Sequence, residues 1–317
     1  MLPNLAPPDV EGTFSTGVGS AVPVGPAPVI NVPPVSTPST RDEPAAPTPL
    51  PELPRRCVTI WDVPFDRVNI DQALHRIEEL VDRRVPSYAI TANLNYCMLH
   101  ESDASVRRIT ADADLIVADG QPIVWRSQLT QNPLPERVTG SDMLGHLCRM
   151  AAYRGWRIYL LGGARDVPER AAEALRKTYP RLKIVGTESP PFRDLSEQEK
   201  ASQRERIRSA RPDILLVAFG QPKGDHWIYE NHDELGVPFS MQVGASFDFM
   251  AGNVHRAPLW MQVTGLEWFH RMIHEPRRLV PRYAANAVFL GQALVRDWRR
   301  LVTHWGLGNW TANERRR

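Results

Sequence analysis

Cysteine and long apolar runs are both scarce in this chain of 317 residues. Its three cysteines, Cys57, Cys97 and Cys148, lie far apart and lack the C-x-x-C spacing of zinc and redox sites. We therefore expect reduced packing residues in a cytoplasmic protein. A membrane-spanning helix needs roughly eighteen or more apolar residues. The nearest run, AANAVFLGQALV, is shorter and contains Asn286 and Gln292, so the sequence argues against both a disulfide scaffold and a spanning helix.

The N-terminal segment has almost no large side chains and no periodic apolar face. Of the 29 prolines in the chain, 14 lie in this segment, before residue 55, and its first cation is Arg41. Such a segment cannot bury enough apolar surface to offset its ordering entropy. We predict a disordered, Pro-rich tail over residues 1–54, which is not a secretory signal. Binding of a proline-recognising partner stays open, because no specific motif supports it.

Residues 55–253 alternate between short β-branched runs and amphipathic helical patterns. The runs are VTIW, SYAIT, DLIVA, RIYLLG, KIVGT, ILLVAF and FSMQVG. This alternation predicts an α/β core: a Rossmann-like, mostly parallel sheet with helices on both faces. Helix starts are expected at three places, namely Asn69 with Asp71, Ser141 with Asp142, and Asp166 with Pro168.

Polar residues and glycines recur where these predicted strands end. In open α/β sheets, ligands collect beyond the carboxyl ends of the strands. The segment GQPKGDHW, which follows ILLVAF, has more turn formers than one strand-to-helix turn needs. We therefore expect one shared pocket, lined by Thr91, Asn93, Asp119, Gly162, Gly163, Gly220, Gln221 and Gly244.

Residue types alone leave several roles open at this edge. Asp119 suits a general base, or equally the cap of a helix that begins near Gln121. Thr91 and Asn93 suit either sugar hydroxyls and a diphosphate or a helix cap. Arg137 follows a proline-broken loop, where it could brace phosphate charge or pair with a surface acid.

Two further patterns are weaker. The segment YLLGG resembles the phosphate-binding turn of a dinucleotide site, but it lacks the full G-x-G-x-x-G spacing. The D-x-D pattern of Asp112 and Asp114 precedes a strand instead of following one, which favours a helix-to-strand turn over a metal site. No metal site is expected.

Charge is unevenly placed along the chain. Residues 254–317 hold eleven arginines and four acidic residues, a balance of +7 that leaves −5 for the rest. Arginine interleaved with tryptophan suits an anionic membrane surface or a phosphate-rich ligand. The alternative is a solvated basic helix bundle that closes the core. Nucleic acid is the other use of such a surface, and we do not expect it. A homo-oligomer is one way to cover this surface.

Several segments together resemble the WecG/TagA/CpsF family of bacterial glycosyltransferases over about residues 57–283. They are TANLNY, ADG, ERVTGSDML, LLGG, FGQPKGDHW and VGASFDFMAGNVHRAPLWMQVTGLEWFHRMIHEPRRL. The resemblance implies an inverting, metal-independent enzyme without a cofactor. It would transfer a sugar from a UDP-sugar to a polyprenyl-diphosphate-linked sugar at the inner face of the plasma membrane.

The resemblance also implies residue roles. Asp119 is expected to be the general base, with Thr91 and Asn93 on the sugar and Arg137 and Gln221 on the donor diphosphate or acceptor. Gly244 and Asp248 fall in the nucleotide-contacting segment. The basic end, residues 254–317, would contact the membrane, and its candidate lipid-diphosphate ligands are Arg271, Arg277, Arg278 and Arg282.

The sugar itself is not specified: N-acetylmannosamine, its uronate and glucose all stay open. Two hypotheses from other classes also stay open. YLLGG prompts a nicotinamide-dependent oxidoreductase, and the Pro-rich tail with the Arg/Trp-rich end prompts a non-catalytic membrane scaffold.

Overall fold

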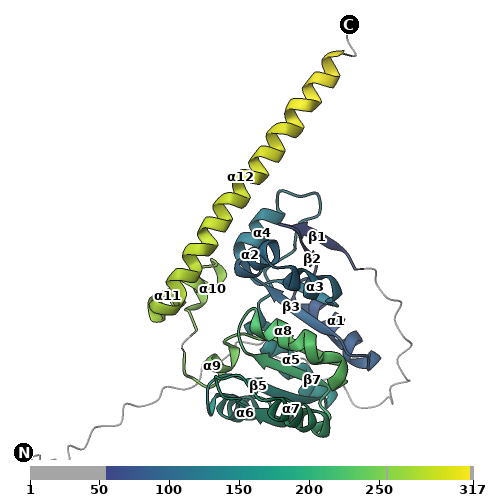
Figure 1. Cartoon of the computed structure of the whole chain (residues 1–317), viewed down its shortest axis with the longest axis vertical. Coiled ribbons are helices and arrows are strands. Elements are labelled where there is room, and N and C mark those ends of the chain that lie inside the picture. The colour runs from purple at the N-terminus through teal and green to yellow at the C-terminus, as the bar shows by residue number, and fades with distance from the viewer. Residues whose placement is uncertain (1–54, 255, 315–317) are drawn as a thin grey trace, which may run out of the picture. The chain divides into compact units, whose positions relative to one another are not determined.

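The computed structural model describes residues 55–254 and 256–314, and the predicted Pro-rich tail lies outside them. Its centre is a six-stranded sheet in which every neighbouring pair is parallel (Figure 1). The predicted Rossmann-like α/β fold is thus confirmed. In spatial order the strands are β4 (Leu115–Ala118), β3 (Tyr88–Ala92), β8 (Phe239–Gln242), β7 (Ile214–Ala218), β5 (Arg157–Gly162) and β6 (Lys183–Glu188).

Helices cover both faces of this sheet. Strand β7 shows why: Ile214 and Leu216 are buried in one apolar cluster, and Leu215 and Val217 in the other. A strand buried on both faces needs an unbroken apolar run, because successive side chains point to opposite faces. The first cluster includes α1 (Ile70–Arg83), α5 (Gly140–Arg154), α6 (Val167–Thr178) and α9 (Ser246–Met250). The second includes α2 (Leu94–Ser102), α3 (Ala104–Asp112), α4 (Gln121–Ser127), α7 (Glu197–Ala210) and α8 (Lys223–Leu235).

The first predicted strand does not join this sheet. It forms β1 (Cys57–Ile60), which pairs antiparallel with β2 (Val63–Asp66) in a two-stranded hairpin. Trp61 and Asp62 connect the two strands with positive φ angles. A connection of two residues makes a hairpin, whereas parallel strands need a long crossover.

Helix starts were predicted with mixed success. Asn69 caps α1 in a reciprocal capping box with Gln72. The second start was wrong, because Thr139 is the cap of α5: its hydroxyl accepts the N–H of Asp142 at 3.1 Å. Ser141 and Asp142 already lie in the first turn of that helix.

The chain after the core is helical. It forms α10 (Leu259–Val263), α11 (Glu267–His274) and α12 (Pro276–Glu314). Helix α12 packs on the core through Phe289, whose ring meets Trp61 edge to face at 5.8 Å. Asp297 accepts hydrogen bonds from Trp61 Nε1 at 3.2 Å and Arg126 Nε at 2.6 Å. Nowhere in 55–254 or 256–314 does a helix combine the length and apolar character needed to cross a membrane.

Candidate active site

Asp119 lies directly beyond the carboxyl end of β4, where its backbone N–H donates to Ala92 at the end of β3. Its partly buried carboxylate accepts a hydrogen bond from the backbone N–H of Gly140. Burial raises the pKa of Asp119 to about 6, and the neighbouring Arg137 opposes that rise. Glu267 and Asp142 add to it, because like charges disfavour ionisation. A carboxylate that titrates near neutrality suits a general base.

The structural alternative for Asp119 does not hold. The N-cap of α4 is Gly120, and no described side chain makes a cap hydrogen bond there. Asp119 therefore does not cap the helix that follows it. Its partly buried carboxylate contacts the start of another helix instead, because it accepts the N–H of Gly140 in the first turn of α5.

Arg137 approaches Asp119 from the loop before α5. Its Nη2 donates to the carbonyl oxygen of Gln262 at 3.0 Å, and its Nη1 lies 3.8 Å from Glu267 Oε2. The acid that pairs with it is therefore on α11 and largely buried. Arg137 is thus held near the candidate base by the C-terminal helices.

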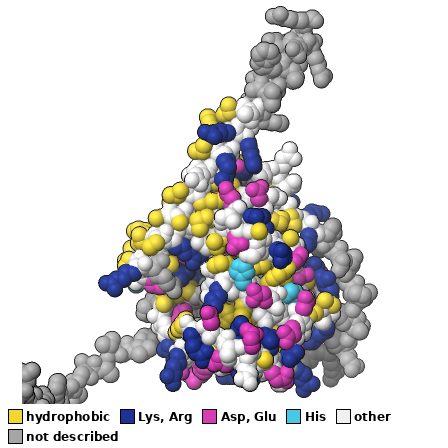
Figure 2. Space-filling view, viewed as in Figure 1, with side chains coloured by type: hydrophobic (Ala, Val, Ile, Leu, Met, Phe, Trp, Pro, Cys, Tyr) yellow, Lys and Arg dark blue, Asp and Glu magenta, His cyan; other side chains and the backbone are white. Residues whose placement is uncertain are grey.

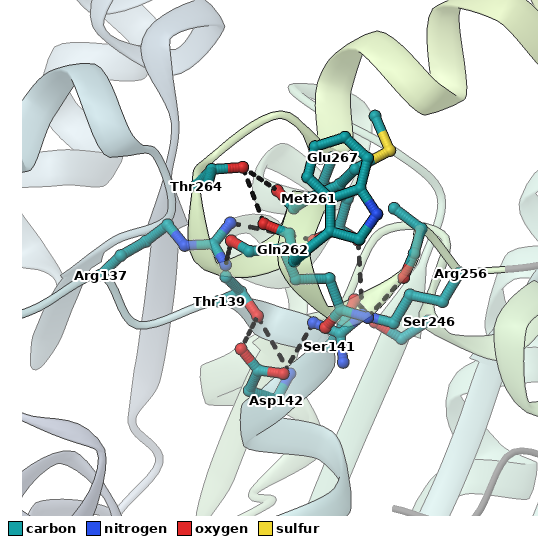
Figure 3. Close-up of polar contacts among 12 residues, drawn as sticks. Arg137, Thr139, Ser141, Asp142, Ser246, Arg256, Met261, Gln262, Thr264 and Glu267 are labelled. Atoms are coloured by element: carbon teal, nitrogen blue, oxygen red, sulfur yellow. Dashed lines mark hydrogen bonds and ion pairs between the residues drawn. The ribbon is translucent and has the colours of Figure 1, made fainter.

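Arg137 belongs to a network of charged side chains, which is drawn in Figure 3. Arg256 Nε lies 3.4 Å from Glu267 Oε1, and its Nη2 lies 2.7 Å from Asp142 Oδ1. The hydroxyl of Thr139 donates to the other oxygen of Asp142 at 2.8 Å. Acids and arginines alternate along the series Asp142, Arg256, Glu267 and Arg137, so every charge in it has an opposite neighbour (Figure 3).

The other predicted polar residues sit near the ends of β3 and β7. Thr91 is buried in β3, where its hydroxyl donates to the carbonyl of Gln242 at 3.4 Å. Asn93 caps α2, and its Oδ1 accepts the N–H of Tyr96 at 3.2 Å. Gln221 Nε2 donates to the backbone oxygen of Thr91 at 2.8 Å, so the loop after β7 joins β3 here.

Buried acceptors in this region have no hydrogen-bond partner among the described residues. They are Oε1 of Gln221, Oε1 of Gln242 and Oδ2 of Asp225. Unpaired buried polar atoms are costly, so each of these acceptors calls for a partner such as a water molecule or a polar ligand. Burial also raises the pKa of Asp225 to about 7.

The predicted glycines end three strands. Gly162 is the last residue of β5 and Gly163 follows it, both in positive-φ conformations. A Cβ on Gly162 would lie 2.9 Å from the backbone of Ala218, so this glycine permits the close approach of β5 and β7. Gly220 and Gly244 also have positive φ, yet an added Cβ there would meet no described atom within 4 Å. The backbone at these two positions is thus open to a ligand, and Asp248 follows one turn later in α9.

The four candidate lipid-diphosphate arginines lie on the last two helices. Arg271, on α11, stacks over the ring of Phe249 at 5.8 Å, and Arg277 is exposed near the start of α12. Arg282 is partly buried on α12. Arg278 belongs to the same helix, and its side chain lies outside the described part of the chain.

The D-x-D pattern lies at the opposite edge of the sheet. Asp112 ends α3 and accepts the hydroxyl of Tyr229 at 2.8 Å. Asp114 Oδ2 accepts the N–H of Tyr88 at 3.1 Å, just before β4 begins. Both carboxylates therefore serve the helix-to-strand turn that we predicted.

Three charged residues of the site were missed by the sequence reasoning as site residues. Asp142 was interpreted only as a cap, while Arg256 and Glu267 were assigned no role. For Arg256 and Glu267 the available signal was their place inside the long run HRAP…GLEW, in which polar residues are embedded among apolar ones. That pattern predicts burial, and buried charges need partners.

Comparison with known proteins identifies the family of this chain. Residues 58–303 match the Glycosyl transferase WecG/TagA/CpsF family. A relative from Bacillus subtilis (strain 168), named N-acetylglucosaminyldiphosphoundecaprenol N-acetyl-beta-D-mannosaminyltransferase, is 30% identical over 236 residues, which is 73% of this chain and 90% of the relative. A protein of the same name from Staphylococcus aureus (strain MW2) is 27% identical over 227 residues, 70% of this chain and 86% of the relative. The match spans the sheet, the sheet edge at Asp119 and helix α11, which carries Glu267. The chain therefore belongs to the WecG/TagA/CpsF family of glycosyltransferases.

Proposed function

We propose that this glycosyltransferase transfers a sugar from a UDP-sugar to a polyprenyl-diphosphate-linked sugar, with inversion and with Asp119 as the general base. The observation that carries the proposal is the carboxylate of Asp119, which is partly buried and lies near Arg137 at the carboxyl edge of the sheet, and whose pKa burial raises to about 6. Three hypotheses were open: a glycosyltransferase, a nicotinamide-dependent oxidoreductase and a non-catalytic membrane scaffold. The family assignment favours the glycosyltransferase.

The chemistry needs one base and one leaving group. Asp119 takes the proton of the acceptor hydroxyl as its oxygen attacks the anomeric carbon, while the bond from that carbon to UDP breaks and UDP leaves with the electron pair. A single displacement inverts the anomeric centre and needs no second carboxylate as nucleophile. The β-linkage in the relatives' name is what inversion of an α-linked UDP-sugar would produce.

The departing diphosphate must be stabilised as its charge develops. Arg137 is close to the base, and the backbone at Gly220 and Gly244 is open to a ligand. Guanidinium groups and backbone N–H groups stabilise such charge without reorganising during the reaction. We therefore propose that the enzyme works without a metal or other cofactor.

The relatives' name suggests the substrates. We propose N-acetylmannosamine as the sugar transferred and N-acetylglucosaminyl-diphosphoundecaprenol as the acceptor. The uronate of N-acetylmannosamine and glucose are the competing donors.

The test is sugar transfer in the presence of EDTA, from a panel of radiolabelled UDP-sugars to the lipid-diphosphate N-acetylglucosamine acceptor. We expect transfer from UDP-N-acetylmannosamine at the rate seen without EDTA, and a β-linked product by NMR. Acceptor that lacks the diphosphate serves as the control. An α-linked product would overturn inversion, loss of transfer with EDTA would overturn metal independence, and no transfer from any UDP-sugar would overturn the reaction.

The C-terminal helices carry the surface that we propose to meet the membrane. Arginines lie among exposed apolar side chains there, and Figure 2 shows hydrophobic side chains along the visible side of α12. Apolar groups that enter the headgroup region beside cations favour an anionic bilayer. A lipid-linked acceptor would place the enzyme at the inner face of the plasma membrane. The exposed apolar residues are Trp260, Leu266, Trp268, Phe269, Ile273, Val280, Val288, Leu294, Val295, Trp298 and Val302.

Replacing Trp260 and Ile273 together by serine should weaken membrane binding. Their side chains are 62% and 59% exposed, so folding should be little affected. We expect about a tenfold fall in affinity for vesicles that contain phosphatidylglycerol, measured by sedimentation. The control is Phe192→Ser, on the loop between β6 and α7, which is 88% exposed. Equal binding by all three proteins would contradict the proposed surface.

A further inference from the structure

Two arginines from distant parts of the chain converge on one carboxylate. Arg137 Nη1 and Arg256 Nε lie 3.8 Å and 3.4 Å from the two oxygens of Glu267 (Figure 3). Arg137 precedes α5, Arg256 follows α9, and Glu267 is the first residue of α11. Glu267 is therefore the point at which three separate segments are tied together by charge.

The position of Glu267 is fixed by the turn that precedes it. Gly265 has a φ of +75°, and a Cβ there would lie 2.7 Å from Cβ of Gln121 in α4. Only glycine allows the chain to pass so close to α4 in this conformation. The carbonyl of Gln262, in α10, holds Arg137 from the same side. The carboxylate thus reaches the two arginines from a rigid support.

The three charged side chains of this arrangement are mostly buried, which strengthens the interactions between their charges. The side chains of Arg137, Arg256 and Glu267 are only 15–24% exposed. Two guanidinium groups so poorly solvated repel each other unless an anion lies between them. The described contacts engage two nitrogens of each guanidinium, and a guanidinium has five N–H donors in all. Donors therefore stay available on both arginines for a second anion.

We propose that Glu267 is a positioning residue, whose carboxylate holds Arg137 and Arg256 as a convergent pair for the diphosphate of the sugar donor. Arg256 is then the second arginine of that diphosphate site. The inference rests on the proposed function, because the ligand that would use the pair is the donor diphosphate. Arginine suits this task because its fork matches two phosphate oxygens at once.

The network also reaches the base. Glu267 and Asp142 raise the pKa of Asp119, Arg137 lowers it, and the N–H of Gly140 stabilises its ionised form. Together the three carboxylates outnumber the two arginines by one charge. Removing the charge of Glu267 should therefore make Asp119 ionise at lower pH, whether or not substrate is present.

The decisive variant is Glu267→Gln, which keeps the shape and removes the charge. We expect kcat to fall at least about tenfold, because the arginines lose their common anchor as leaving-group charge develops. The donor KM should stay equal or fall, since a competing negative charge has gone. The acid limb of the pH profile of kcat/KM should move to lower pH. Glu173→Gln, an exposed carboxylate on α6, is the matched control and should change none of these values.

Arg256 is tested separately by its affinity for UDP. Arg256→Gln should weaken UDP binding by about tenfold in calorimetry, and Arg256→Lys should restore part of it, because lysine keeps the charge without the fork. Glu267→Gln with wild-type kcat and an unmoved acid limb would overturn the positioning role. UDP affinity unchanged in Arg256→Gln would overturn its place in the site.

Failure of the proposed function would look different. If the wild-type protein transfers no sugar and binds no UDP, the donor diphosphate is not the ligand of the two arginines. The positioning of the arginines would still be measured by NMR of their guanidinium groups and by carbon-13 titration of Asp119. In Glu267→Gln, broader guanidinium signals and a lower titration midpoint of Asp119 would support the positioning role of Glu267. Unchanged spectra would overturn it.

Discussion

Replacing Asp119 with asparagine should reduce sugar transfer by about a hundredfold to ten-thousandfold, the range over which a general base contributes. Asparagine keeps the size of the side chain but cannot take the acceptor proton. The measurement is kcat/KM with UDP-N-acetylmannosamine and the lipid acceptor. In the wild-type enzyme this value should rise with pH through an apparent pKa of about 6, the pKa of Asp119. Transfer by the variant at more than a tenth of the wild-type rate would contradict the role.

A measurement of folding stability distinguishes the expected loss of transfer in Asp119→Asn from unfolding of the variant. Because burial raises the pKa of Asp119 from its ordinary value to about 6, the folded protein holds the proton more tightly than the unfolded chain does. The stability contributed by this group therefore falls as pH rises from about 4 to about 6, and the full penalty applies above that window. Asp119→Asn removes the penalty. We expect it to raise the free energy of unfolding at pH 7.5 by about 1 to 3 kcal/mol in urea titrations, with no gain below about pH 4.

The matched control for Asp119 is Asp112→Asn. Asp112 is an exposed carboxylate at the opposite edge of the sheet, where it accepts the hydroxyl of Tyr229. We expect transfer within about twofold of wild type, because surface substitutions away from the site have small effects. Loss of transfer here, with Asp119→Asn active, would move the chemistry to the D-x-D edge and overturn the proposed site.

Replacing Arg137 with glutamine should lower kcat/KM by about a hundredfold to a thousandfold, the usual loss when one stabiliser of developing charge is removed. Arg137 also lowers the pKa of Asp119, so its removal should move the acid limb of the pH profile to higher pH. The shift in Glu267→Gln should have the opposite sign. An arginine whose charge did not act on Asp119 would leave the acid limb in place when it is replaced.

The control for Arg137 is Arg204→Gln. Arg204 lies on α7 and pairs with Glu234 on α8 at 3.0 Å, in an ion pair near the surface. Such pairs contribute little to stability, so both activity and unfolding should stay close to wild type. An Arg137→Gln enzyme with more than a third of the wild-type kcat/KM and an unmoved acid limb would contradict its place beside the base.

The sheet and its helices could be predicted because their signals are local. Each strand buried on both faces needs an unbroken apolar run, and each amphipathic helix needs an apolar stripe. The mistakes were also local. The hairpin residues Trp61 and Asp62 carry no glycine or asparagine to mark a tight turn, and Thr139 was overlooked as a cap because Ser141 and Asp142 are equally good caps two residues later.

By itself, the sequence determined the α/β class, because strands and helices can be read from local composition. It also predicted an edge of the sheet for a ligand, and the family resemblance singled out Asp119 there as the candidate base. Only the tertiary structure excluded Asp119 as the cap of the helix that follows it, since Gly120 occupies the cap position. It alone brought Arg137, Arg256 and Glu267 together. Arg256 lies 119 residues after Arg137 and Glu267 lies 148 residues after Asp119, and pairing across such separations leaves no local pattern. Buried charge is costly without a partner, so the fold had to bring these residues into contact.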